Sequence, residues 1–166
     1  MVLGMSLATF TFLHVLISLV GICSGLVVMF GFLVGKRLDV WTAIFLIFTV
    51  LTSVTGFGFP FDHLLPSHKV GLISLVVLAI AIPARYLFHL VGAWRRVYVI
   101  GASVAFYLNV FVLVVQLFMK VPALNALAPT QKEPPFLIAQ LLVMAVFIVL
   151  TIFATIKFRA EPVRAV

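Results

Sequence analysis

Histidine is the residue type through which this chain could do chemistry, and it occurs four times. Two histidines lie in the stretch Phe57–Lys69, which reads F-G-F-P-F-D-H-L-L-P-S-H-K and also holds an aspartate. Neutral imidazoles and a carboxylate form a workable ligand set for zinc, copper or non-haem iron. The expected ligand or metal-binding residues are His14, Asp62, His63 and His68. Solvated or capping histidines in the loop, and a structural role for the first histidine, remain alternatives.

Haem b and a quinone are two further ligands that the histidines could serve. His14 and His89 are expected at opposite depths, separated by about 20 Å at 1.5 Å per residue, so they could not share one iron. His14 with His63 or His68 could share one if the loop folds inward. A quinone would take an imidazole or amide at each carbonyl oxygen, beside Phe57, Phe59 and Phe61 in the same stretch.

Composition places these residues in an integral membrane protein. The 166 residues are 65% hydrophobic and 9% charged, whereas a soluble domain carries about 25% charged residues. The net charge of +7 comes from short basic clusters between apolar runs. Such clusters are topology signals and form no basic stripe, so nucleic-acid binding is not expected. Cys23 is the single cysteine, which excludes an intramolecular disulfide and a cysteine-based metal site.

Five apolar runs are long enough to cross a membrane as helices, since a span needs roughly 20 residues. The predicted fold is therefore an all-α, five-span transmembrane bundle, with residues 1–166 as a single domain. The expected spans are 9–34, 40–59, 70–92, 97–119 and 136–157. Gly58, Pro60 and Pro66 are expected to keep the Phe57–Lys69 stretch free of helix as a turn between spans.

The distribution of lysine and arginine predicts the orientation. The links after the first and third spans and the C-terminal tail carry most of the basic residues, including Lys36, Arg37, Arg95 and Arg96. The positive-inside rule then places the N-terminus outside and the C-terminus in the cytoplasm. We expect a multi-pass protein of the inner, or plasma, membrane whose Phe57–Lys69 turn faces outward.

Polar side chains gather in the predicted outer half of the spans. In the first span, His14, Ser18, Gly21 and Gly25 share one helix face, and small residues there would let a neighbouring helix approach closely. Polar groups inside a bundle are candidates for a ligand path. We expect a cavity ringed by spans 1, 2, 4 and 5 and covered by the turn. Around the ligand candidates it would hold Thr52, Ser53, Asn109, Gln116, Lys120 and Gln140.

A second polar pair, Arg85 and His89, lies toward the cytoplasmic end of the third span. Their spacing of one helical turn favours side chains that snorkel together to lipid head groups. An ion pair between the arginine and Asp39 is the alternative.

In outline, with a histidine in the first span, a glycine-rich face and histidine-bearing outer loops, the chain resembles small inner-membrane proteins of bacteria. It is more loosely similar to membrane-bound b-type cytochrome and copper-handling bundles. The resemblance covers the whole chain without a specific motif and implies a helical bundle that binds a redox cofactor.

Two functions follow from these patterns with equal weight. The first is binding of a metal, haem or quinone in an outward-facing pocket, in a redox or ligand-binding role. The second is a non-enzymatic accessory or assembly subunit of a larger membrane complex. A transporter or channel working as a homo-oligomer ranks behind both. No P-loop, G-x-S-x-G, H-E-x-x-H or C-x-x-C motif identifies a reaction, so enzymatic activity stays an open question.

Overall fold

The computed structural model describes residues 2, 4–60 and 66–159. These residues form the helices α1 (Leu7–Leu33), α2 (Asp39–Gly56), α3 (Pro66–Tyr86), α4 (Ala93–Lys120), α5 (Pro122–Leu127) and α6 (Pro134–Lys157). All but α5 are long and apolar enough to span a membrane, which makes five such helices. The expected all-helical bundle is thus confirmed in architecture, while insertion of these helices in a membrane and their direction across it stay predictions.

The third helix differs from its expected limits at both ends. It begins at Pro66, inside the stretch that was expected to be free of helix. Proline fits the first position of a helix because the N–H that it lacks would have no intrahelical partner there. The helix ends at Tyr86 instead of residue 92, and the Leu90 N–H bonds back to the Ala84 carbonyl oxygen at 3.1 Å. Together with the bond from the Phe88 N–H to the Pro83 carbonyl oxygen at 2.9 Å, it satisfies carbonyl oxygens of the last turn that have no partner within the helix.

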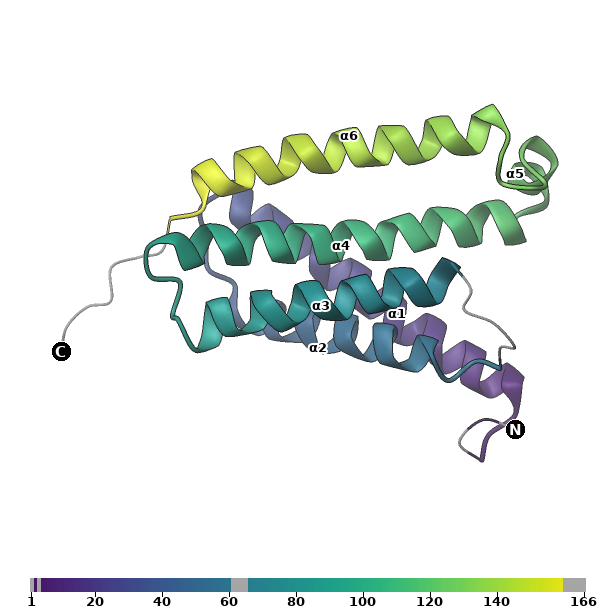
Figure 1. The fold of residues 1–166 in the computed structure, drawn as a ribbon, viewed down its shortest axis with the longest axis horizontal. Coiled ribbons are helices and arrows are strands. Elements are labelled where there is room, and N and C mark those ends of the chain that lie inside the picture. Colours follow the sequence, from purple (N-terminus) through teal and green to yellow (C-terminus); the bar gives the residue numbers. More distant parts are fainter. Residues whose placement is uncertain (1, 3, 61–65, 160–166) are drawn as a thin grey trace.

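Helix α4 is the centre of the bundle. It packs against α3 and α6 and also touches α1 and α2, while α1 lies along α2. In Figure 1 the helices run side by side, with α6 and α3 flanking α4 and with α1 crossing behind at an angle. We call the end where α1 begins and α4 ends the cavity end. The opposite end, where α1 and α3 end and α4 begins, is called the basic end.

Aromatic rings fill the centre and the basic end of the bundle. The Phe106 ring of α4 makes edge contacts with Phe45 of α2, at a centroid distance of 6.1 Å, and with Phe147 of α6, at 5.0 Å. Nearer the basic end, Phe32 of α1 meets Tyr98 of α4 at 5.6 Å. These side chains are all nine-tenths or more buried. Edge-to-face ring pairs each add about 0.5–1.5 kcal/mol beyond their buried area.

Two glycines of α1 have different neighbours. A Cβ atom added at Gly25 would lie 2.6 Å from Cδ2 of Phe106, so α1 and α4 approach as closely as a missing side chain allows. A Cβ atom at Gly21 would meet α2 at 3.6 Å, near Phe48 and Thr49, which is an ordinary contact. The small-residue face of the first span therefore faces both α2 and α4.

This difference predicts opposite results for two alanine substitutions. Gly25→Ala should lower the free energy of unfolding by about 1–3 kcal/mol, because the Phe106 ring is packed on other rings and cannot move aside. Gly21→Ala is the matched control on the same helix, and we expect it to leave stability unchanged or slightly raised, since alanine favours helix. Thermal unfolding in detergent measures both, and equal melting temperatures for the two variants would contradict the packing described.

Candidate functional site

A cavity of about 580 Å³ lies at the cavity end, between α1, α2, α3 and α4. Its volume falls within the range of roughly 300–1,000 Å³ that is usual for small-molecule sites. Apolar residues such as Val15, Leu19, Val112 and Leu113 form much of the wall. The polar side chains on the wall are those of Thr11, His14, Ser18, Thr52, Ser53, Ser67, His68, Ser74, Asn109, Gln116 and Lys120.

The structure brings together most of the residues that the sequence singled out. His14, His68, Thr52, Ser53, Asn109, Gln116 and Lys120 all line the cavity. Gln140 does not, because it lies on α6 and its Nε2 donates to the Phe111 carbonyl oxygen of α4 at 3.2 Å. The fourth wall is therefore α3 and not the fifth span, which corrects the expected arrangement. Asp62 and His63 lie outside the described residues.

Residues of α3 supply the part of the site that sequence reasoning missed. Ser67, Gly71 and Ser74 line the cavity on one face of that helix. They follow one another at steps of four and three, the same small-residue spacing as in the first span. That pattern was present in the sequence and could have identified α3 as a wall. The hydroxyls of Thr52 and Ser74 are buried, and neither has a hydrogen-bond partner in the described part of the chain.

The hydrogen bonds of His14 determine which of its ring nitrogens carries a proton. Nδ1 lies 2.7 Å from the Thr55 hydroxyl oxygen, and that hydroxyl donates its single hydrogen to the Leu51 carbonyl oxygen at 2.7 Å. With that hydrogen directed at Leu51, the hydroxyl accepts from the imidazole, which assigns the ring hydrogen to Nδ1. In the neutral ring, Nε2 then keeps its lone pair. The ring is held edge-on against Phe59 at a centroid distance of 5.1 Å.

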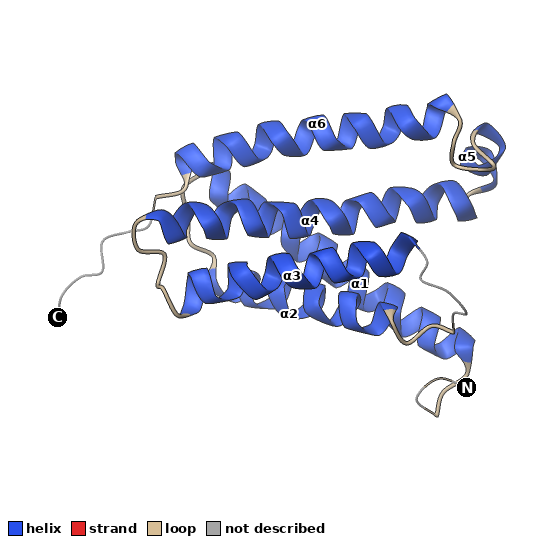
Figure 2. Cartoon of the chain, viewed as in Figure 1, coloured by secondary structure: helices blue, strands red, loops and turns tan. Residues whose placement is uncertain are grey.

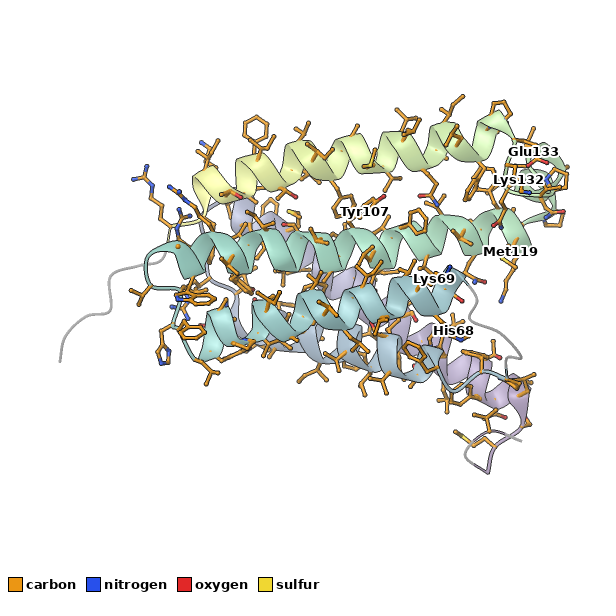
Figure 3. The ribbon with its side chains drawn as sticks, viewed as in Figure 1. His68, Lys69, Tyr107, Met119, Lys132 and Glu133 are labelled. Atoms are coloured by element: carbon orange, nitrogen blue, oxygen red, sulfur yellow. The ribbon has the colours of Figure 1, made fainter. Side chains whose placement is uncertain are left out.

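The second histidine of the cavity is held by an aromatic ring. His68 is 3% exposed, and its imidazole stacks on Phe57 at 5.4 Å with an interplanar angle of 22°. Figure 3 labels it at the start of α3, at the cavity end. Within the described ranges no three residues of the types histidine, cysteine, aspartate and glutamate gather closely enough to hold a metal ion. Of the four expected metal ligands, the described part of the cavity contains His14 and His68.

A polar bridge crosses the deeper part of the site. The Asn109 side-chain amide of α4 donates to the Thr49 hydroxyl oxygen of α2 at 3.0 Å. Both residues are buried, and the bond satisfies an amide that would be costly to bury alone. The bridge holds α2 and α4 together at mid-helix, and Asn109 also forms part of the cavity wall.

The cavity is open at the apolar surface of α1. Val15 and Leu19 line it, yet they are 41% and 43% exposed. On α4, Leu117 also lines it and is 39% exposed. Exposed apolar side chains on spanning helices face the acyl chains. The cavity can therefore be reached from the apolar surface of the helices.

The polar pair at the basic end differs from its expected arrangement. The Arg85 side chain is only 2% exposed and forms an ion pair with Asp39 through Nη2 and Oδ1. Its guanidinium also lies 5.1 Å from the centre of the Tyr98 ring. The favoured expectation that it snorkels with His89 to head groups is therefore wrong, and the alternative pairing is present. His89 lies beyond the end of α3, with φ 48°, so the two residues do not share a helix face.

Comparisons of this chain with models of protein families, with curated proteins and with solved structures find no match.

The ion pair at the basic end predicts a sharp difference between two charge removals. Asp39→Asn leaves the buried guanidinium of Arg85 without its carboxylate. Breaking a buried pair costs about 3–5 kcal/mol, and because the Asp39 side chain is 66% exposed, we expect a smaller loss of roughly 1–3 kcal/mol. Arg37→Gln removes the exposed partner of the same carboxylate, 3.5 Å away, and should cost less than about 0.5 kcal/mol. Unfolding in detergent measures the free energy of both variants. Equal losses of unfolding free energy for Asp39→Asn and Arg37→Gln would contradict the role given to Arg85.

Proposed function

We propose that the chain is a ligand-binding membrane protein whose cavity takes the ring head group of a quinone or quinol, with the ligand's apolar tail leaving between α1 and α4. The observation that carries the proposal is the His14 imidazole, bonded through Nδ1 to the Thr55 hydroxyl, on the wall of a cavity that is open at the apolar surface of the helices. By the positive-inside rule the cavity would face the outer side of the inner membrane.

The wall provides partners for both ends of such a ring. A quinol hydroxyl would donate to Nε2 of His14. The oxygen of the second quinol hydroxyl would accept from the amide of Gln116 or the ammonium of Lys120, both on α4. The buried hydroxyls of Thr52 and Ser74, which have no partner in the described residues, add two more donors. Apolar walls with a few convergent polar groups are typical of sites for small organic ligands.

The opening toward lipid favours a quinone over the other ligands considered for this site. A metal ion requires several charged or imidazole ligands around one point, and the described residues gather no such group of three. A haem held by His14 and His68 would need both imidazoles to reach one iron from α1 and α3. A quinone needs only single hydrogen bonds at its oxygens and an apolar route for its tail.

Replacing His14 tests the proposed hydrogen bond. His14→Leu should weaken binding of decyl benzoquinol roughly three- to tenfold, because a hydrogen bond to a neutral group contributes about 0.5–1.5 kcal/mol. Calorimetric titration of the purified protein in nanodiscs measures the dissociation constant. His89→Asn at the basic end is the control, and it should bind the quinol as the wild-type chain does.

The same preparation separates the alternatives. A haem band in the absorption spectrum, or stoichiometric metal in elemental analysis, would show that the protein binds that cofactor and would contradict the quinol proposal. Wild-type protein that binds no quinol, contains neither cofactor and purifies together with other membrane proteins would support the accessory-subunit hypothesis instead.

The lateral opening predicts an effect of bulk at one position of α1. Leu19→Trp should obstruct the space between α1 and α4 and lower quinol affinity by about tenfold or more, since an added large side chain in a packed site is costly. Leu16→Trp is the matched control, because Leu16 is exposed to a similar degree, 44% against 43%, but does not line the cavity. Equal affinities for the two variants would show that the ligand does not pass α1.

A further inference from the structure

A second hollow lies at the basic end, far from the cavity. This shallow groove of about 450 Å³ is lined by Arg37, Asp39, Val40, Ala43, Arg85, Tyr86 and His89. These residues come from the link after α1, the first turns of α2, the end of α3 and the segment that follows α3. The groove has no part in the proposed quinone site.

Positive charge exceeds negative charge in this groove. Arg37 and Arg85 both bond to the same oxygen, Oδ1 of Asp39. Two guanidinium groups thus share one carboxylate, which leaves one positive charge uncompensated when His89 is neutral. No other acidic residue of the described part of the chain lines the groove.

Arg85 also has unused hydrogen-bonding capacity. Its side chain is 2% exposed, and its Nε has no hydrogen-bond partner among the described residues. Within the described part of the chain, Asp39 is the only charged residue to which it bonds. A buried guanidinium with few partners is costly, so a further anion in the groove would stabilise this end of the bundle.

We infer that the groove binds a phosphate group, supplied by the head group of an anionic phospholipid. Guanidinium groups match phosphate oxygens in geometry and charge, and the exposed imidazole of His89 offers another donor. Val40 lines the groove and is 72% exposed, and Leu87, which follows the groove residue Tyr86 in sequence, is 69% exposed, which suits contact with acyl chains. Basic pockets between spanning helices bind anionic head groups in this manner.

The chain's two tryptophans provide a probe at the right place. Trp41 follows the groove residue Val40 in sequence. Trp94 stacks at a centroid distance of 3.9 Å on Phe88, the residue that precedes His89 of the groove. Binding in the groove should change their fluorescence, whereas the cavity lies at the other end of the helices. A quinol that occupies the cavity would therefore not mimic the signal.

The experiment titrates the full chain in detergent micelles with dioctanoyl phosphatidylglycerol, dioctanoyl phosphatidylcholine and inorganic phosphate, following tryptophan fluorescence. We expect saturable binding of phosphatidylglycerol and weaker binding of phosphatidylcholine. Arg37→Gln should weaken the phosphatidylglycerol affinity about fivefold, as expected for one arginine near an anionic head group. Arg37 is exposed, so this variant should fold and keep the pair between Asp39 and Arg85.

Lys36→Gln is the matched control, because it removes the same charge from the neighbouring exposed residue, which does not line the groove. His89→Asn is a second groove variant, and it retains a residue type that tolerates positive φ. If inorganic phosphate competes at the same concentrations as phosphatidylglycerol, the groove is a phosphate site whose occupant is a free anion. That result would overturn the assignment to a lipid head group. Equal responses to both lipids, or equal effects of Arg37→Gln and Lys36→Gln, would overturn the inference.

Discussion

The close approach of Gly25 to the Phe106 ring is the contact on which the cavity depends. Helices in lipid gain little from burying apolar surface against one another, so their association depends on close packing. Phe106 is held between the rings of Phe45 and Phe147, and it therefore fixes the position of α1 against α4. From this point toward the basic end, the two helices stay in contact through Phe32 and Tyr98. Toward the cavity end, the space between them is part of the cavity.

The two ends of the bundle accommodate polar groups in different ways. At the cavity end, hydroxyls bond to carbonyl oxygens one turn earlier in their own helices, as Ser18 does to His14 and Ser53 to Thr49. These bonds satisfy the hydrogens of the two serine hydroxyls, and no described residue donates to Nε2 of the His14 imidazole on the same wall. At the basic end, a buried guanidinium is balanced by one carboxylate at the start of α2. Hydroxyls, amides and imidazoles thus line the proposed quinone site together with one lysine, Lys120, whereas two arginines and an aspartate line the proposed phosphate site.

Much of the architecture could be predicted from the sequence, because apolar length alone identifies a spanning helix. The polar residues of α1, α2 and α4 were expected to converge, since those on each helix share a face, and they do line one cavity. The order of neighbours around the bundle was not predictable in this way. Hydropathy does not distinguish α3 from α6 as the fourth wall, and Gln140 looks equally suitable until its bond to Phe111 is seen.

The environment of Arg85 shows a second limit of sequence reasoning. Snorkelling and ion pairing both suit an arginine near the end of a span, and the choice depends on how close the start of α2 lies to the end of α3. That distance follows from tertiary packing. Pro66 was misjudged for a local reason, because proline ends a helix from within but also begins one.

Nitrogen-15 NMR of the His14 imidazole in nanodiscs tests the central claim most directly, with the resonances assigned by comparison with His14→Leu. The bond between Nδ1 and the Thr55 hydroxyl, and the bond from that hydroxyl to the Leu51 carbonyl oxygen, predict that Nδ1 carries the proton and that Nε2 does not. A saturating short-chain quinol should then shift the Nε2 resonance much more than the Nδ1 resonance. A proton on Nε2 with Nδ1 unprotonated, or a spectrum that the quinol leaves unchanged, would contradict the proposed site.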